Sequence, residues 1–354
     1  MHERSYGAQR VSLELTNICN LHCGYCLRDE DALYHSPAKF FPIPLLQKIA
    51  RAGRDTAGIE HISFTGGEPT LHPQFAEAVA TVAREGLTTS FVTNGWHFER
   101  AWPAIAAHPH AVTLVAFSLD GATREAHDKW RGEGSFVRLV RAISRCRHYA
   151  LPFEIKTVVR KDTLPQLEEI AMFSARMGAA ALNFGHILPT SDGFNSELGL
   201  SADERTMAEQ EIAVLARMFK MPIRLDTGYY NIDSSRPPCS PLAGRSCNID
   251  YRGYLTLCCN LSGFRGAVGE GDVVADLNIE DFAEAYARLR RLADQQLETW
   301  RATLAEYEAR DERPDLAVGS PCLFCLQTLG KTPWRDAEVS KLERRALPVV
   351  NTAA

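Results

Sequence analysis

Three cysteines near the start of the chain have the residue type and the spacing to hold an iron–sulfur cluster. Cys19, Cys23 and Cys26 form a C-x3-C-x2-C pattern, which brings three thiolates together on one short loop. A closed structural zinc site takes four ligands, and an ordinary four-iron cluster also takes four cysteines. Three cysteines would leave one iron of such a cluster open to bind another molecule. The alternatives are a partial zinc site with His22 as fourth ligand, or reduced thiols with no ligand role.

A second group of six cysteines lies in the last third of the chain. Nine of the 10 cysteines in the sequence belong to these two groups. In a reducing compartment, cysteines at this density indicate metal ligation rather than disulfides. The remaining cysteine, Cys146, occupies an apolar position of a helical pattern and is predicted to be a buried core residue. The members of the second group are Cys239, Cys247, Cys258, Cys259, Cys322 and Cys325.

The composition is that of a globular protein with no evident nucleic-acid or membrane partner. The 354 residues are 45% hydrophobic and 23% charged, the net charge is −5, and the basic residues are scattered along the chain. The N-terminal residues contain no apolar signal-peptide core, and no stretch reaches the roughly 18 apolar residues of a membrane helix. We therefore expect a soluble, cytoplasmic protein that binds neither nucleic acid nor membranes.

The first half of the sequence alternates short apolar runs with amphipathic helical patterns, which predicts a parallel sheet with helices outside it. Six such repeats are too few to close an eight-stranded barrel, so the predicted fold class is α/β with an open (β/α)6 partial TIM barrel. Chemistry in barrel folds sits at the C-terminal ends of the strands, and the cysteine loop directly follows the first strand. The predicted strands are Val11–Ile18, His61–Thr65, Thr88–Thr93, Thr113–Leu119, Phe153–Val159 and Ala181–His186, and the helices include Pro73–Glu85, Phe136–Tyr149 and Leu164–Met177.

Further motifs follow the ends of later predicted strands. The second strand leads into Gly66–Pro69, whose paired glycines let the backbone approach a ligand closely. The third strand ends at Asn94, the fourth carries Ser118 and Asp120 at its end, and Arg131 follows shortly after. Taken singly, these are also ordinary turn sequences. Their repeated position after strands predicts that they lie at the same edge of the sheet as the cysteine loop.

Together, the C-x3-C-x2-C loop, the Gly-Gly-Glu-Pro sequence after the second strand and the later strand-end motifs resemble the radical SAM enzymes. The resemblance implies that the open iron of a 4Fe-4S cluster binds the amino and carboxylate groups of S-adenosylmethionine. One electron, supplied by an external flavodoxin- or ferredoxin-type reductant, then splits the sulfonium and yields a 5′-deoxyadenosyl radical. The cofactor contacts that it implies are Tyr25 at adenine, Gly66, Gly67, Glu68, Pro69 and Asn94 along the methionine side, and Ser118, Asp120 and Arg131 near ribose or carboxylate.

The second cysteine group resembles a SPASM domain or the shorter twitch domain. Cys239 is followed after thirteen residues by Gly253, and Cys258 comes five positions later, as at the start of such a domain. A full SPASM domain has more cysteines after its C-x2-C pair, whereas only a polar tail follows Cys325. The resemblance therefore implies one auxiliary 4Fe-4S cluster, with metal ligands Cys239, Cys258, Cys322 and Cys325.

Three alternatives stay open at this second site. Zinc would suit the same four cysteines equally well. Cys247 could replace Cys239 as a ligand, and Cys259 could replace Cys258. In sulfatase-maturing relatives an aspartate at the place of Cys259 takes a proton from the substrate radical. A thiol there could act as base or hydrogen donor if its pKa were suitably tuned, or it could be an inert neighbour.

These patterns divide the chain into a radical SAM barrel at 1–195, a helical or linker bridge at 196–236, an auxiliary-cluster domain at 237–335 and a polar tail at 336–354. The resemblance implies oxidative modification or cross-linking of a ribosomally made peptide, with the auxiliary cluster binding the substrate or accepting the second electron. Many such maturases carry an N-terminal leader-binding domain, but only 18 residues precede Cys19, so we expect either a separate leader-binding protein or a leaderless mode of substrate binding. The alternatives are radical oxidation of a small molecule, such as an aminocyclitol or sugar, and a non-catalytic iron–sulfur or zinc scaffold.

Overall fold

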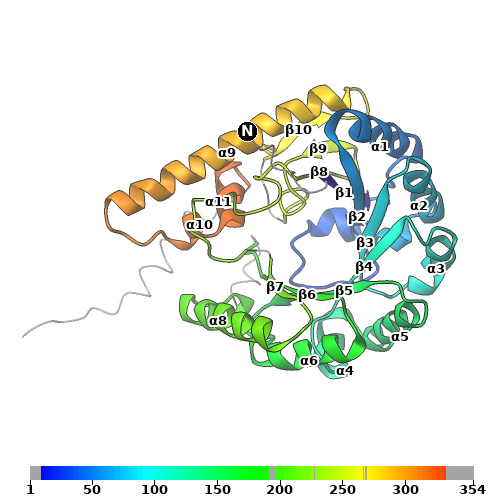
Figure 1. Cartoon of the computed structure of the whole chain (residues 1–354), viewed down its shortest axis with the longest axis horizontal. Helices are drawn as coiled ribbons and strands as arrows, with labels where there is room; N and C mark the ends of the chain where they lie inside the picture. The colour runs from blue at the N-terminus through cyan, green and yellow to red at the C-terminus, as the bar shows by residue number, and fades with distance from the viewer. Residues whose placement is uncertain (1–8, 191–196, 227, 266, 268, 332–354) are drawn as a thin grey trace, which may run out of the picture.

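A single curved sheet organises the molecule, which is described by a computed structural model over residues 9–190, 197–226, 228–265, 267 and 269–331 (Figure 1). The strands of this sheet are β1 (Gln9–Thr16), β2 (Ile59–Gly66), β3 (Thr88–Thr93), β4 (Val112–Ser118), β5 (Phe153–Val159), β6 (Ala181–His186), β7 (Ile223–Leu225), β8 (Ser246–Ile249), β9 (Tyr254–Thr256) and β10 (Val273–Asp276). They follow one another in the order β10-β9-β8-β1-β2-β3-β4-β5-β6-β7. The sheet is open, because β10 and β7 are its two edges.

The parallel arrangement predicted for the first six strands is confirmed and extends further at both ends. β1 to β6 pair in chain order and in parallel, β7 joins β6 in parallel, and β8 joins β1 in parallel. Only the pairs β8–β9 and β9–β10 of this sheet are antiparallel. The strands of the auxiliary region therefore continue the barrel sheet, so the cysteine loops after β1 and after β9 belong to neighbouring parts of one framework.

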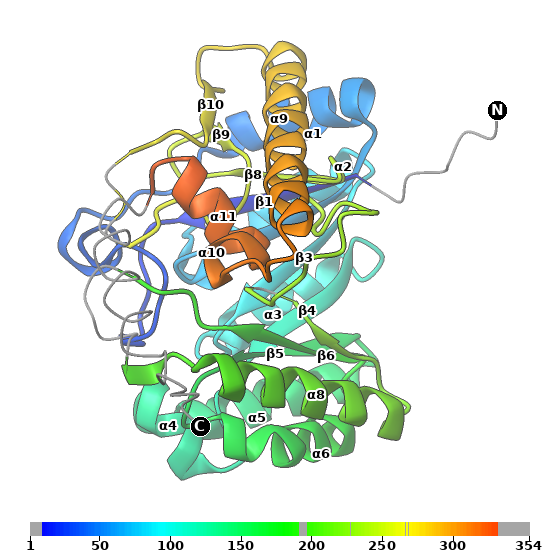
Figure 2. The same ribbon diagram turned by 90° about the vertical axis from the view of Figure 1, so that its left-hand side faces the viewer.

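Helices cover the outer face of the curved sheet, and the loop that follows β1 lies inside the curve (Figure 1). Helix α9 packs against α1, β9, β10, α10 and α11 (Figure 2). The α-helices are α1 (Ile43–Ala57), α2 (Phe75–Arg84), α3 (Phe98–Ala107), α4 (Arg124–Arg131), α5 (Ser135–His148), α6 (Leu167–Met177), α8 (Ala202–Met218), α9 (Phe282–Ala309), α10 (Leu316–Gly319) and α11 (Pro321–Thr328), with short helical turns at Asp31–His35, Pro69–Leu71 and Leu164–Gln166.

The alternation of side chains along the strands explains why one face is apolar and the other polar. In β5 the buried residues Phe153 and Ile155 join the hydrophobic core beneath the helices, while Glu154 and Lys156 point the other way. On the same inner face, the His61 ring lies 2.8 Å from the hydroxyl groups of both Thr88 and Ser90. The inside of the curve is thus lined by polar groups, which suits a site for a polar ligand rather than a packed core.

The strands observed at Thr88–Thr93, Phe153–Val159 and Ala181–His186 have the predicted bounds, whereas β1 ends two residues before the predicted Ile18. The reason is that the backbone N–H groups of Gly67 and Glu68 donate to the carbonyls of Thr16 and Ile18 at 2.9 and 2.8 Å. The chain therefore leaves the sheet at Asn17 to begin the cysteine loop, and the end of β2 fastens the start of that loop.

A small second core supports the auxiliary region. Trp300 of α9 is fully buried and packs with Leu297, Leu304 and Phe324, and its indole N–H donates to the carbonyl of Val318 at 2.9 Å. Phe324 lies between the two cysteines of the C-x2-C pair, so this core fixes the helix that carries them. The four predicted domain bounds stay a prediction, and the predicted tail at 336–354 lies outside the described residues.

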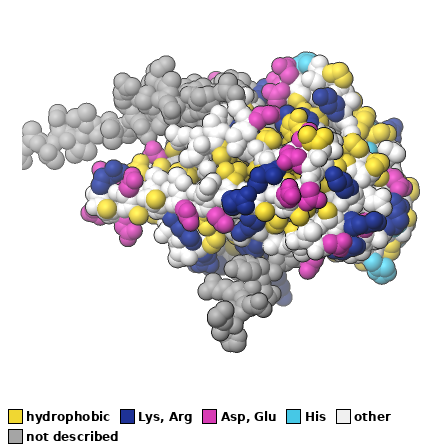
Figure 3. Space-filling model, turned by 90° about the horizontal axis from the view of Figure 1, so that it is seen from above, with side chains coloured by type: hydrophobic (Ala, Val, Ile, Leu, Met, Phe, Trp, Pro, Cys, Tyr) yellow, Lys and Arg dark blue, Asp and Glu magenta, His cyan; other side chains and the backbone are white. Residues whose placement is uncertain are grey.

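One face of the surface shows acidic and basic side chains interspersed with apolar ones (Figure 3). Within the part of the chain that the structure describes, no helix combines the length and the apolar character needed to span a membrane.

Candidate active site

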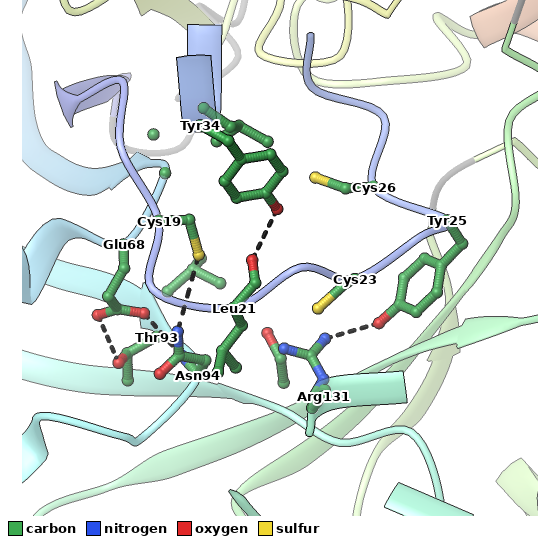
Figure 4. Close-up of a pocket in the computed structure, with 15 residues that line it drawn as sticks. Cys19, Leu21, Cys23, Tyr25, Cys26, Tyr34, Glu68, Thr93, Asn94 and Arg131 are labelled. Atoms are coloured by element: carbon green, nitrogen blue, oxygen red, sulfur yellow. Dashed lines mark hydrogen bonds between the residues drawn. The ribbon is translucent and has the colours of Figure 1, made fainter. Parts of the chain in front are cut away.

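The loop after β1 brings the three N-terminal cysteines to one cavity. Cys19, Cys23 and Cys26 line a cavity of about 160 Å³ that is partly open to solvent, together with Gly66, Gly67, Glu68 and Arg131 (Figure 4). Burial raises the pKa of Cys19 to about 12 and that of Cys23 to about 11. These thiols would ionise at neutral pH only beside a bound cation, and a set of sulfur donors suits an iron–sulfur cluster. The donor set and the cavity therefore fit the predicted cluster.

His22 is turned away from the three thiols. Its side chain is exposed and stacks on the ring of Tyr34, with 4.0 Å between ring centroids, and it is not among the residues that line the cavity. The hydroxyl of Tyr34 in turn donates to the carbonyl of Leu21 at 2.6 Å, which holds the loop closed. His22 thus acts in loop packing, and its position does not support a fourth-ligand role.

The paired glycines at the end of β2 are required by the cysteine loop itself. Gly66 has φ +120°, which favours glycine, and a Cβ on Gly67 would overlap the carbonyl group of Ile18. We expected the close approach to be toward a ligand. The structure shows that the backbone that approaches most closely is the chain's own segment just before Cys19, so the glycines set where the first cysteine stands.

Replacing Gly67 with Ala is expected to destabilise the fold by about 3 kcal/mol, because the added methyl group has no space beside Ile18. Chemical denaturation of the apo chain measures the effect, and iron bound after anaerobic reconstitution reports on the cysteine loop. Gly86→Ala is the matched control, since Gly86 has φ +74° and no neighbour within 4 Å of the added Cβ, and should cost about 1 kcal/mol. Equal effects of the two substitutions would contradict the steric role of Gly67.

Glu68 is a structural carboxylate that joins three segments. It is buried, and its oxygens accept hydrogen bonds from the hydroxyl of Thr93 at 2.8 Å and from the backbone N–H of Asn94 at 2.9 Å. Burial raises its pKa, although these hydrogen bonds act against that shift. The Asn94 amide then donates to the side chain of Asn20 at 3.1 Å, next to Cys19. Glu68 and Asn94 therefore couple the ends of β2 and β3 to the cysteine loop, while Pro69 begins a helical turn.

A buried charge network holds the opposite wall of the cavity. The carboxylate of Asp120 accepts hydrogen bonds from the Tyr25 hydroxyl, from Arg131 and from Arg160, the last at 2.9 Å. Arg131 also donates to the Tyr25 oxygen at 2.8 Å, so the two cavity-lining side chains are held together. Burial alone would raise the pKa of Asp120, but the two guanidinium groups hold it well below its usual range. Asp120 thus positions Tyr25 and Arg131, whereas Ser118 lines the cavity directly.

Arg160 is a site residue that no sequence motif predicted. It is fully buried, its guanidinium lies 4.3 Å from the centroid of the Tyr25 ring and 4.7 Å from that of Trp130, and it also pairs with Asp162 at 3.0 Å. Arg160 could have been found in the sequence by its position, because it directly follows the strand Phe153–Val159, just as Asn94 and Asp120 follow earlier strands. The orientation of Tyr25 is therefore fixed by two charged residues, Asp120 after β4 and Arg160 after β5.

The four cysteines predicted as auxiliary ligands lie near one another. Cys322 and Cys325 are three residues apart on α11 and so share one face of it. The pKa of Cys325 is raised by burial and then by the nearby charges of Cys239 and Cys322. The pKa of Cys258 is raised by a hydrogen bond to Cys259 and by burial, and further by Cys322 and Cys239. Four thiols from three segments are thus within electrostatic reach of each other, which fits a sulfur-ligated metal group.

Cys259 and Cys247 have surroundings unlike those of these four residues. The thiol of Cys259 donates to the side-chain oxygen of Asn260 at 3.9 Å. Arg28, Glu14 and Lys156 are within electrostatic reach of Cys259. Cys247 lies in β8 within the main hydrophobic core, where burial raises its pKa to about 12.

No three His, Cys, Asp or Glu side chains of the described residues converge closely enough to hold a single metal ion.

Tyr229 and Tyr230, which lie between the two cysteine groups in the sequence, form hydrogen bonds with the chain itself. The hydroxyl of Tyr229 donates to the carbonyl of Pro238, and that of Tyr230 donates at 2.7 Å to the carbonyl of Pro314.

Comparison with known proteins finds a family match in the first half of the chain. Residues 13–173 match the sequence profile of the Radical SAM superfamily. Mycofactocin maturase MftC from Mycobacterium tuberculosis is 30% identical over 226 residues, which are 62% of this chain and 54% of the relative. AdoMet-dependent heme synthase from Oleidesulfovibrio alaskensis is 28% identical over 203 residues, 56% of this chain and 50% of the relative. The chain thus spans about half the length of these curated relatives.

Solved structures with the same fold include SuiB from Streptococcus suis bound to S-adenosylmethionine, with a TM-score of 0.63 at 14% identity, covering 80% of this chain and 68% of SuiB. Another is anSMEcpe with bound AdoMet and the Cp18Cys peptide, with a TM-score of 0.65 at 15% identity, covering 96% of this chain and 99% of that protein. These similarities confirm the α/β partial-barrel fold.

Proposed function

We propose that this chain is a radical SAM enzyme, as the match of residues 13–173 to the Radical SAM superfamily supports, and that it oxidatively modifies or cross-links a ribosomally made peptide. The observation that carries the radical chemistry is the convergence of Cys19, Cys23 and Cys26 on one cavity with Gly67 and Arg131. A 4Fe-4S cluster held there by the three cysteines would, with S-adenosylmethionine bound, supply a 5′-deoxyadenosyl radical. Tyr25 and Arg131 would orient the cofactor, because Asp120 holds both side chains at the cavity wall.

The auxiliary site is proposed to hold one further 4Fe-4S cluster on Cys239, Cys258, Cys322 and Cys325. Support comes from the electrostatic proximity of these thiols and from the two hydrogen bonds of Asn260, whose amide lies 3.9 Å from the Cys322 sulfur and whose backbone N–H lies 3.5 Å from that of Cys258. Such a cluster would bind the substrate or accept its second electron. Cys259, next to the proposed ligand Cys258 and within electrostatic reach of Arg28, Glu14 and Lys156, is the proposed proton or hydrogen donor to the substrate.

A peptide substrate is supported by the relatives. MftC is a maturase, one solved SuiB structure contains the precursor peptide SuiA, and anSMEcpe has been solved with a bound peptide. The polar inner face of the sheet, with Lys156 placed 3.6 Å from Glu154 and 3.7 Å from Asp226, offers charged groups to a peptide backbone or side chain. A small polar molecule such as a sugar would use the same groups, so an experiment must separate the two substrate classes.

Metal analysis tests the auxiliary cluster. We expect about eight irons per chain after anaerobic reconstitution, and about four after Ala replaces any one of Cys239, Cys258, Cys322 or Cys325. Cys247→Ala is the matched control and should keep about eight, because Cys247 lies in the main core. About four irons together with bound zinc in the wild-type chain would overturn the auxiliary cluster in favour of a zinc site.

Deuterium transfer tests the substrate class. The source organism is grown in deuterated medium, its peptides and its small molecules are separated, and each fraction is incubated with the reconstituted enzyme, S-adenosylmethionine and a reductant in ordinary water. We expect deuterium in 5′-deoxyadenosine with the peptide fraction only, and we expect protease treatment of that fraction to abolish the transfer. Transfer from the small-molecule fraction alone would overturn the peptide proposal and favour oxidation of a compound such as an aminocyclitol.

A further inference from the structure

Arg28 lies on the cysteine loop, two residues after Cys26, at the contact between the two cysteine regions. Its guanidinium forms an ion pair with Glu14 of β1, with 2.7 Å between Nη1 and Oε1, and also donates to the carbonyl of Ser262. The Glu14 side chain is 3% exposed and that of Arg28 is 14% exposed. One buried cation thus touches the barrel strand and the loop that follows Cys258.

Main-chain hydrogen bonds hold these two loops side by side. Arg28 and Phe264 form an antiparallel bridge, the N–H of Asp29 donates to the carbonyl of Gly263 at 2.8 Å, and the N–H of Arg265 donates to that of Leu27 at 2.8 Å. The segment after the first cysteine group therefore pairs like a short ribbon with the segment after Cys258. The distance between the two regions is fixed by this ribbon and not by a flexible linker.

The charge of Arg28 acts on both cysteine regions. Arg28 is two residues from Cys26, and its guanidinium donates to the carbonyl of Ser262, four residues after Cys258. An arginine side chain stays protonated in proteins, so Arg28 places a permanent positive charge between the two cysteine regions. Glu14 is itself anchored from the auxiliary side, since the amide of Asn248 on β8 lies 3.4 Å from its carboxylate.

We propose that Arg28, held by Glu14, is a positioning residue whose fixed positive charge sets the reduction potentials of the groups bound at the two cysteine regions. This inference rests on the proposed function, because it needs both clusters to be present. A cation near a cluster stabilises the reduced, more negatively charged form and so raises the reduction potential, whereas an anion lowers it. The low dielectric of a buried site strengthens both effects. In the wild-type enzyme, the positive charge of Arg28 and the negative charge of Glu14 therefore act on the reduction potentials in opposite directions.

Redox titrations of the reconstituted enzyme, followed by electron paramagnetic resonance, test the proposal. Arg28→Gln should move the potentials to more negative values and Glu14→Gln to more positive values, while the double variant Arg28→Gln/Glu14→Gln should lie between them. A purely structural role would not produce shifts of opposite sign. Arg28→Lys keeps the charge and should restore the wild-type potentials.

Arg288→Gln serves as the control. Arg288 on α9 also pairs with a glutamate, Glu280, but the two side chains are 35% and 38% exposed, so solvent screens that pair. We expect its potentials to equal those of the wild type. Potentials that do not move in Arg28→Gln and Glu14→Gln, or that move in the same direction in both, would overturn the proposal.

Iron content separates this inference from the proposed function. If the Arg28→Gln variant loses its clusters, the reduction potentials of Arg28→Lys and of the double variant test the proposal instead. An Arg28→Lys enzyme with full iron content but shifted potentials would overturn it. A wild-type chain that binds no iron would overturn the proposed function and the inference with it. A wild-type chain with about eight irons and insensitive potentials would overturn the inference alone.

Discussion

Replacing Cys19, Cys23 or Cys26 with Ala is expected to abolish the cleavage of S-adenosylmethionine. Each of the three thiols lines the same cavity, and His22, the other candidate ligand of this loop, is stacked on Tyr34 and does not line it. We expect the formation of 5′-deoxyadenosine to fall by about a thousandfold or more, equivalent to about 4 kcal/mol of activation free energy. The measurement is chromatographic quantification of 5′-deoxyadenosine after anaerobic incubation with a reductant.

The control for these substitutions is Cys146→Ala. Cys146 is buried in α5 and belongs to the hydrophobic core, so its loss should leave the cavity unchanged. The variant should form 5′-deoxyadenosine at the wild-type rate and retain about eight irons per chain. A triad variant that cleaves S-adenosylmethionine as fast as Cys146→Ala would contradict the assignment of the three ligands.

Asp120→Asn is expected to cause the largest loss of stability, about 3–5 kcal/mol of unfolding free energy. The substitution leaves the buried guanidinium groups of Arg131 and Arg160 facing a neutral side chain. It also weakens the hold on Tyr25, so the affinity for S-adenosylmethionine should fall together with stability. Urea denaturation measures the first effect, and isothermal titration of the reconstituted enzyme measures the second.

Asp162→Asn is the matched control for Asp120→Asn, because Asp162 pairs with the same Arg160 side chain but is 24% exposed. Solvent can replace part of that interaction, so we expect a loss of about 1 kcal/mol. An Asp120→Asn enzyme as stable as Asp162→Asn would show that the buried network contributes little to stability.

The pH dependence of stability gives a second test of Asp120. Its pKa in the folded chain is held well below the usual value by Arg131 and Arg160. The stabilising contribution is therefore fully present above the unfolded pKa of about 4 and is lost as the pH falls from there toward the folded pKa. The unfolding free energy of the apo chain should decline in this acidic range, and Asp120→Asn should lack this part of the decline.

Much of the framework could be predicted from the sequence because it depends on local patterns. Strands such as Thr88–Thr93 and Ala181–His186 are short apolar runs between helical patterns, and they occur with the predicted bounds. The cysteine spacing and the Gly66–Pro69 sequence likewise lie within single loops. Such features depend on residues that are neighbours in the chain, so a single sequence contains the information needed to find them.

The features that escaped prediction depend on contacts between distant segments. Arg160 and Arg28 are single arginines with no motif, and their roles appear only when Arg160 meets Asp120 and Arg28 meets Glu14. The pairing of β8 with β1 joins residues more than 230 positions apart, as in the register of Val11 with Cys247. Sequence patterns carry no record of such pairings, which are fixed by the packing of the whole sheet.

Gly67 shows how a motif that is correctly located can have an additional physical cause. Its backbone freedom was expected to serve a ligand, but the structure shows that it accommodates the carbonyl of Ile18 at the start of the cysteine loop. The motif and the cysteines are therefore one unit in the fold. This explains why a single methyl group at Gly67 should affect the placement of Cys19.

The most direct test of the central claim concerns the open iron of the cluster on Cys19, Cys23 and Cys26. The reduced, reconstituted enzyme is mixed with S-adenosylmethionine isotopically labelled at its amino nitrogen, and electron–nuclear double resonance is recorded. We expect a hyperfine coupling from that nitrogen to the cluster, which is lost in the Cys23→Ala enzyme. A reduced enzyme with both clusters intact and no coupling from the bound S-adenosylmethionine would contradict the claim that this loop leaves an iron open for the cofactor.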